Sequence, residues 1–216
     1  MTEVKLRNLL RYALTILLGT ALGVVLAIHV VRTGAFASDV RIGPWQTGRD
    51  FGSADASART RAVVALRGLL ALPAKEARYY TADTDSAGRP LDGRCRYRVA
   101  GGSLPARWWS LTLYDPDGYL VANPAGRYSV ESAAVEPERP AAATPEMAAI
   151  LATQLAAEAR WAIRVAPSPP GGSAVNWIPT GGLPNFQLTL RLYLPITGVG
   201  AQTTSAALPT IVQEGC

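Results

Sequence analysis

The chain has 216 residues, two cysteines, one histidine and a formal net charge of +5. After an apolar lead of about 35 residues, the length leaves room for one domain with its own core and excludes two domains of ordinary size. The first 32 positions carry four basic residues and one acidic residue, and so supply +3 of the charge. The remaining +2 excludes the broad basic surface that nucleic-acid binding requires, so we expect no nucleic-acid partner.

Residues 12–31 form an uncharged apolar stretch that contains His29 near its end. A helix of this length spans about 30 Å, the thickness of a hydrocarbon core. Basic residues are more numerous before this stretch than after it. The positive-inside rule therefore predicts a single-pass protein of a bacterial inner membrane, with residues 1–11 in the cytoplasm, a transmembrane helix over 12–31 and the rest in the periplasm or outside. The lipid bilayer is an expected partner.

A cleaved signal peptide is the alternative interpretation of this N-terminus. Ala35-Phe36-Ala37 has the small-x-small form of a cleavage site. The apolar stretch is longer than the usual signal-peptide core of about 7–15 residues, and Arg32 interrupts the approach to the site, which favours an uncleaved anchor. Both interpretations export the domain.

Export makes a disulfide between Cys95 and Cys216 the favoured state of the two cysteines, since an oxidising compartment joins such pairs. Closing so long a loop stabilises a fold by about 4–5 kcal/mol in the entropic treatment. Two free thiols are the alternative.

Residues 32–52 are rich in glycine and polar residues and predict an extended linker, with the domain over 53–216. Ser53 or Asp55 is expected to cap a helix over about 53–72, which Pro73 ends. Residues 94–99 then alternate between arginine and apolar side chains, as in a strand. The face that carries Arg94, Arg96 and Arg98 is either an anion-binding surface or a charged strand edge that discourages aggregation.

Residues 106–124, ARWWSLTLYDPDGYLVANP, show the clearest alternation and predict a hairpin with a turn at 115–118. One face of the first strand is expected to carry Trp109, Leu111 and Leu113, and the other Trp108, Ser110, Thr112 and Tyr114. Residues 132–145 predict a loop, about 145–160 a short helix, and 161–165 a strand. The last strong strand lies within 186–195, with Leu188, Leu190, Leu192 and Leu194 inward. Short strands separated by turns predict a mainly β fold, an antiparallel β-sandwich with peripheral helices.

The usual catalytic base is missing from the domain, because the one histidine lies in the apolar stretch. This excludes a Ser-His-Asp triad, a Cys-His pair and an HExxH zinc site. GxSxG, P-loop and GxGxxG motifs are absent as well. Asp115 and Asp117 are explained by turn chemistry, and we expect no catalytic residue, metal or cofactor.

Aromatic residues with arginine nearby are the more informative group, since they suit a glycan or another ligand with an apolar face. The candidate ligand-binding residues are Trp108, Tyr114, Trp177, Arg191 and Tyr193. The alternative is that these side chains only cover the core and edges of a small sandwich.

Three motifs together resemble a known bacterial family, domain of unknown function 1214. They are RYYTADTDSAGRPLDGRCRYRV at 78–99, the WWSLTLYD stretch within 106–124, and NWIPTGG followed by FQLTLRLYLP within 176–195. The resemblance covers most of 43–195 and implies a jelly-roll-like sandwich. It also implies a short, single-pass membrane member without the companion domain of unknown function 1254. It implies no activity and no catalytic residues.

The leading hypothesis is thus a membrane-anchored envelope domain that binds a ligand or a partner. One alternative is a hydrolase or lyase that works without histidine, using carboxylates such as Asp83, Asp115 or Asp117 with Arg98 or Arg191 nearby. A structural role within an envelope complex is another.

Overall fold

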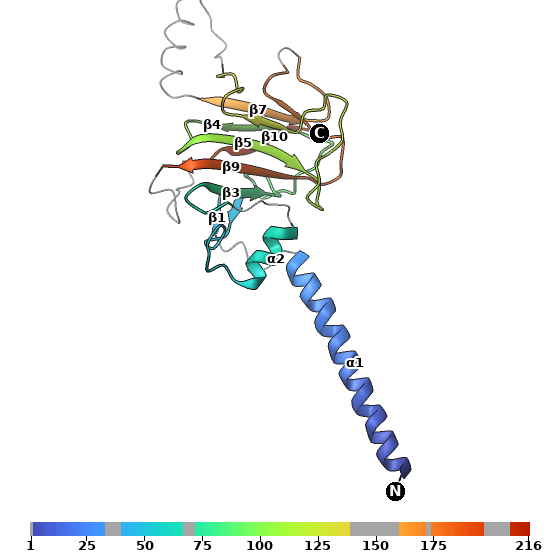
Figure 1. The fold of residues 1–216 in the computed structure, drawn as a ribbon. Helices are drawn as coiled ribbons and strands as arrows, with labels where there is room; N and C mark the ends of the chain where they lie inside the picture. The colour runs from blue at the N-terminus through green and yellow to red at the C-terminus, as the bar shows by residue number, and fades with distance from the viewer. Residues whose placement is uncertain (1, 33–39, 67–71, 139–159, 172–173, 197–207) are drawn as a thin grey trace, which may run out of the picture.

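The structure, a computed structural model, describes residues 2–32, 40–66, 72–138, 160–171, 174–196 and 208–216. Two β-sheets lie against one another, and one long helix projects from them (Figure 1). The strand order is β1-β2-β3-β9-β5-β6 in one sheet and β10-β4-β7-β8 in the other. The predicted fold, a mainly β sandwich with few helices and a long apolar N-terminal helix, is confirmed.

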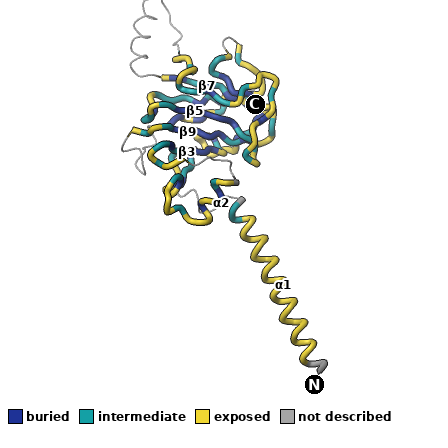
Figure 2. The backbone as a smooth tube through the Cα atoms, viewed as in Figure 1, coloured by how far each residue is buried: buried dark blue, intermediate teal, exposed yellow. Residues whose placement is uncertain are grey.

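Helix α1 (Thr2–Arg32) stands clear of the sheets, with its side chains exposed along nearly its whole length (Figure 2). Its stretch Lys5–Val31 is long and apolar enough to cross a membrane, and its most apolar window is not buried against the protein. At the domain end, Val31 packs against the cluster of Phe51 and Val63. An apolar contact therefore joins the helix to the domain.

The six-stranded sheet is antiparallel throughout. Its strands in spatial order are β1 (Val40–Ile42), β2 (Trp45–Thr47), β3 (Ala77–Ala82), β9 (Gln187–Pro195), β5 (Ala106–Tyr114) and β6 (Ser129–Glu131). The long strand β9 is central, so Leu190 lies between Tyr80 of β3 and Leu111 of β5. This position suits the alternation of β9, whose inward leucines face the second sheet.

The four-stranded sheet contains one parallel pair. Its strands are β10 (Thr210–Gly215), β4 (Arg96–Gly101), β7 (Trp161–Ala166) and β8 (Trp177–Pro179). β4 pairs antiparallel with β10 and β7, but β8 runs parallel to β7. A parallel pair cannot be joined by a tight hairpin turn, which agrees with the ten residues that separate β7 from β8. The antiparallel prediction is corrected for this pair.

The core lies between the two sheets and contains the inward side chains of both. Those that are almost fully buried include Leu111, Leu113, Leu188, Leu190 and Leu192 from one sheet and Tyr97, Val99, Ile163, Val165 and Ile211 from the other. Tyr97 also meets Phe186 edge to face, with ring centroids 5.7 Å apart. The inward faces predicted for residues 94–99 and 109–113 are confirmed.

Leu194 departs from the predicted pattern of β9. It is 46% exposed and has a φ of 46°, in the left-handed region, so the alternation ends after Leu192. Its backbone N–H donates to the carbonyl of Glu76. The Leu194 side chain does not join the inward face formed by the other three leucines.

Part of the predicted linker belongs to the sheet. Residues 40–47 form β1 and β2, and Gln46 pairs with Thr81 of β3. Trp45 is only 1% exposed, packs in the main core and donates its indole N–H to the carbonyl of Pro209 at 2.6 Å. The folded part therefore begins before residue 53, because the buried Trp45 and the pairing of β2 with β3 hold this segment against the core.

Helix α2 (Ala58–Leu66) begins later than predicted. Its cap is Ser57, whose Oγ accepts the N–H of Thr60 at 3.1 Å, while Ser53 and Asp55 lie in turns before it. The Ser53 hydroxyl accepts the N–H of Asp55, an arrangement that closes a local turn instead of a helix. The predicted C-terminal part of this helix falls on residues 67–71, and the helix predicted at about 145–160 falls on 139–159. Both lie outside the described residues.

The predicted hairpin is half right. The turn forms, with the carbonyl of Asp115 accepting the N–H of Gly118 at 3.1 Å. The returning chain makes only the isolated bridge between Tyr114 and Leu120, and the antiparallel partner of β5 on that side is β6. Residues 121–128 thus form a loop between the turn and β6.

A disulfide closes the C-terminal end. Strand β10, for which the sequence provided no prediction, pairs with β4 and brings Cys216 to Cys95, with an S–S distance of 2.07 Å. The predicted Cys95–Cys216 bridge is confirmed.

Candidate functional site

Four of the five candidate ligand-binding residues lie together on the outer face of the six-stranded sheet. We call Trp108, Tyr114, Arg191 and Tyr193 the outer strip. They come from the neighbouring strands β5 and β9, where Trp108 is directly opposite Tyr193. All four side chains are partly exposed. The strip faces away from the core because its residues alternate with the inward residues of the same strands.

Arg191 is fixed at the centre of the outer strip. Its guanidinium donates to the hydroxyl of Tyr114 at 2.8 Å and to the Thr112 hydroxyl at 3.2 Å. Its Cζ also lies 5.4 Å from the centroid of the Tyr114 ring, within range of a cation–π interaction. These contacts hold the charge in place, which lowers the entropic cost of binding an anionic group to it.

The other half of the strip is an aromatic pair. The rings of Trp108 and Tyr193 have centroids 4.9 Å apart and are tilted by 56°. Burial raises the pKa of the Tyr193 phenol above its ordinary value, although the charge of Arg191 acts in the opposite direction. The phenol is therefore neutral at neutral pH and can donate a hydrogen bond.

Trp177 lies apart from the outer strip. It belongs to β8 in the other sheet, is buried, and donates its indole N–H to the carbonyl of Ala166 at 3.0 Å. The parallel pairing of β7 and β8 accounts for this location.

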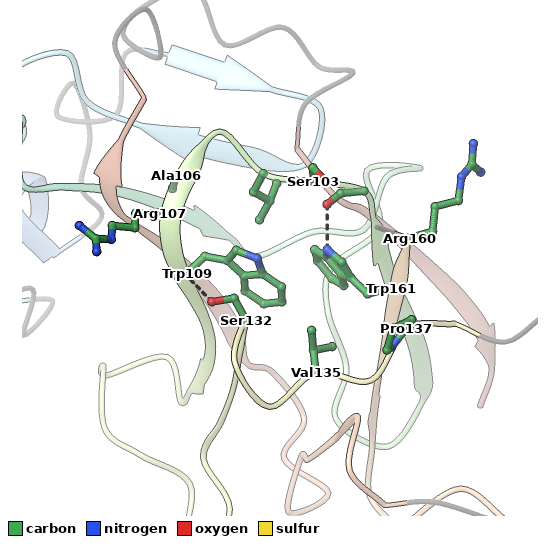
Figure 3. A pocket seen from close by; sticks show the side chains of 11 residues that line it. Ser103, Ala106, Arg107, Trp109, Ser132, Val135, Pro137, Arg160 and Trp161 are labelled. Atoms are coloured by element: carbon green, nitrogen blue, oxygen red, sulfur yellow. Dashed lines mark hydrogen bonds between the residues drawn. The ribbon is translucent and has the colours of Figure 1, made fainter. Parts of the chain in front are cut away.

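A cleft that the sequence did not point to opens at one end of the sandwich, with a volume of about 300 Å³ (Figure 3). Residues of both sheets and of the adjoining loops line it, among them Ser103, Arg107, Trp109, Ser132, Arg160 and Trp161. The rings of Trp109 from β5 and Trp161 from β7 stack inside it, with centroids 4.5 Å apart and an angle of 30°. We call it the tryptophan cleft.

Small residues make room for this ring pair. A Cβ on Gly101 would lie only 3.1 Å from Cζ2 of Trp161, so a side chain there would push on the indole. Trp161 is further held by its indole N–H, which donates to the carbonyl of Gly102 at 2.8 Å. The sequence does place a tryptophan near the start of each of the two strands, and Gly101-Gly102-Ser103 before β5. The sequence around each tryptophan does not show that the two rings contact one another.

Two of the three carboxylates proposed for histidine-free catalysis, Asp83 and Asp115, are engaged in local structure. Oδ1 of Asp115 accepts the N–H groups of Asp117 and Tyr119, and Oδ1 of Asp83 accepts from Gln46 at 3.1 Å. Arg98 pairs with Glu138. None of the described residues that line the tryptophan cleft carries a carboxylate. Within the described ranges, no three His, Cys, Asp or Glu residues gather as metal ligands would.

The arginine stripe on β4 and the segment before it is also partly paired. Arg94 binds Asp92 through its side chain at 2.5 Å, and this hydrogen bond, with one from the Arg94 backbone, lowers the pKa of Asp92 to about 2. Arg98 is bound to Glu138 as described above. Two of its three arginines are thus engaged with carboxylates, which argues against an anion-binding face. The strand-edge interpretation is wrong, because β4 pairs with β10 on one side and with β7 on the other.

The fold and these sites define a β-sandwich domain preceded by an apolar helix. The chain belongs to the family described as protein of unknown function (DUF1214), whose family model matches residues 76–197. The resemblance drawn from the motifs is thereby confirmed. None of the curated proteins matches the chain in sequence.

Solved structures that are similar to this chain include the following two. The VPA0106 protein from Vibrio parahaemolyticus matches with a TM-score of 0.55 and 20% identity, over 90% of this chain and 43% of that one. An uncharacterised protein from Burkholderia cenocepacia matches with a TM-score of 0.37 and 17% identity, over 64% of this chain and 29% of that one. This chain therefore spans less than half the length of either relative, and the first likeness shows the fold alone.

Proposed function

We propose that the protein is a membrane-anchored envelope domain that binds a ligand or partner protein through the outer strip. In this proposal α1 spans a bacterial inner membrane, and the sandwich lies in the periplasm or outside the cell. Support for the anchor comes from the exposed apolar surface of α1, because leaving so much apolar surface in contact with water is energetically unfavourable. The disulfide fits an oxidising compartment.

The observation that carries the binding role is the composition of the outer strip. Tryptophan, tyrosine and arginine are the residues that most often supply the energy of protein interfaces, and their rings also suit the apolar faces of sugars. Here they adjoin one another on a sheet face, and Arg191 is already oriented by Tyr114 and Thr112. Such preorganisation favours recognition of a group that carries a negative charge or strong hydrogen-bond acceptors.

The anchor is tested by membrane extraction of the full chain. We expect the protein to stay in the membrane pellet after alkaline carbonate treatment, and its intact mass to include residues 1–37. The physical reason is that about 20 apolar residues hold a helix in a bilayer against high pH. A soluble product that begins at Ser38 would instead identify residues 1–37 as a signal peptide.

The outer strip is tested by thermal-shift profiling of the full chain in detergent against glycans, lipids and purified envelope proteins. We expect at least one class to raise the melting temperature, and Arg191→Gln and Trp108→Ala each to weaken that binding by about 30-fold, as at an interface hot spot. Arg41→Gln, which removes an exposed arginine on β1, is the matched control and should bind as the wild type does. No shift with any class, or equal loss in all three variants, would refute the proposal and leave the structural role in a complex as the better reading.

A further inference from the structure

We propose that the tryptophan cleft is a second binding site, and that its ligand is a small organic anion with a flat apolar body. The cleft lies between the two sheets, whereas the outer strip lies on the outside of one of them. The two sites are therefore separate and are tested separately.

The shape of the cleft suits a flat apolar group. Its volume of about 300 Å³ falls at the lower end of the range for small-molecule sites. The stacked rings of Trp109 and Trp161 form one part of its wall, with Val135 and Pro137 beside them (Figure 3). Because the rings are already stacked and Trp161 is held by Gly102, little order has to be created when a ligand enters.

Several polar groups of the cleft can donate hydrogen bonds. Among the described residues, the hydrogen bonds of Trp109 involve its backbone, with its N–H donating to Oγ of Ser132 at 3.2 Å and its carbonyl accepting from the Ser132 N–H at 2.9 Å. The indole N–H of Trp109 is thus available to a ligand. Ser103 and Ser132 add hydroxyl groups that can also donate. These donors favour a ligand that carries hydrogen-bond acceptors.

The charge around the cleft is positive. Arg107 and Arg160 lie on opposite sides of it, with their guanidinium groups directed away from the two tryptophans, and none of the described residues that line the cleft is acidic (Figure 3). Arg107 is exposed at the mouth, where its long side chain can turn toward a bound anion.

A third arginine adds to the positive potential. Arg78 of β3 is opposite Leu192, which is opposite Trp109, so Arg78 lies on the same inward row about 10 Å from Trp109. Within the part of the chain that the structure describes, its buried Nε has no hydrogen-bond partner. Arg78 does not line the cleft, but a partly buried cation at this distance adds to the positive potential that an anion there would meet.

The test is equilibrium dialysis of the full chain in nanodiscs of zwitterionic lipid, with empty nanodiscs as the blank. The probes are 2-naphthoate, a flat anion, and 2-naphthalenemethanol, which has the same rings without the charge. We expect naphthoate to bind at one site per chain and about tenfold more tightly than the alcohol, the difference that one charge-assisted hydrogen bond supplies.

Variants then locate the site. Arg107→Gln should weaken naphthoate binding about tenfold and leave the alcohol unchanged, Arg107→Lys should restore most of it, and Trp109→Phe should weaken the anion by removing the indole donor. Arg41→Gln and Arg191→Gln should bind naphthoate as the wild type does. Naphthoate that binds no better than to the blank, equal binding of both probes, or the same loss in Arg41→Gln as in Arg107→Gln would overturn the proposal. Arg107 is exposed, so its variants test the site even if Trp109→Phe does not fold.

Discussion

Replacing Cys216 by serine should lower the free energy of unfolding by about 4–5 kcal/mol. The bond between Cys95 and Cys216 joins residues 121 positions apart, and opening so long a loop returns a large conformational entropy to the unfolded chain. Domains of this size are stable by only about 5–15 kcal/mol, so the change removes a large share of the total. Urea unfolding of the full chain in detergent, followed by tryptophan fluorescence, measures it.

Cys216 is exposed, which makes serine a conservative replacement there. The double variant Cys95→Ala with Cys216→Ser should unfold close to the single variant, because either change opens the same bridge. Dithiothreitol should destabilise the wild type by a similar amount and leave Cys216→Ser unaffected. A wild-type transition that does not move under reducing conditions would contradict the prediction.

Replacing Trp45 by alanine should cost about 3–5 kcal/mol, the usual loss for truncating a large core aromatic residue. Trp45 is almost fully buried in the main core, and its indole N–H binds the carbonyl of Pro209 just before β10. The variant therefore opens a cavity and leaves a buried acceptor without its donor. Chemical unfolding under the same conditions measures the loss.

Two comparisons isolate the cause of that loss. Trp45→Phe keeps most of the apolar volume but not the N–H, so it should be less destabilised than the alanine variant. Tyr119→Ala removes a ring that is 72% exposed and should change the stability by less than about 0.5 kcal/mol. If Trp45→Ala were as stable as Tyr119→Ala, residues 40–47 would be a lead-in segment after all.

The strands with strong alternation were predictable from sequence, since period-two patterning is a local property. β5, β7 and β9 were found in this way, and the inward faces of β5 and β9 were assigned correctly except at Leu194. β1 and β2 were missed because three residues carry too little pattern, and β10 because its sequence TIVQEG does not alternate clearly between apolar and polar residues. Their positions depend on distant partners: Trp45 on the core, and β10 on β4.

The candidate site was predictable in part for the same reason. The parity of Trp108 with Tyr114, and of Arg191 with Tyr193, follows from alternation within one strand. The two pairs lie next to one another only because β5 is paired with β9, and the sequence of either strand does not predict that pairing. The tryptophan cleft was harder still, because Trp109 and Trp161 read separately as core residues and meet only when the sheets pack.

The contact between α1 and α2 bears on how far the domain can reach. Val31 packs on Phe51 and Val63, and Val64 of α2 and Tyr193 of the outer strip both pack on the pair Ala77 and Tyr79. A continuous row of apolar contacts thus leads from the proposed anchor to the outer strip. These contacts restrict the movement of the domain relative to its helix. A domain held in this way reaches only molecules that lie about one domain length from the bilayer surface. We therefore expect its binding partner to be in the same membrane or in the envelope layer next to it.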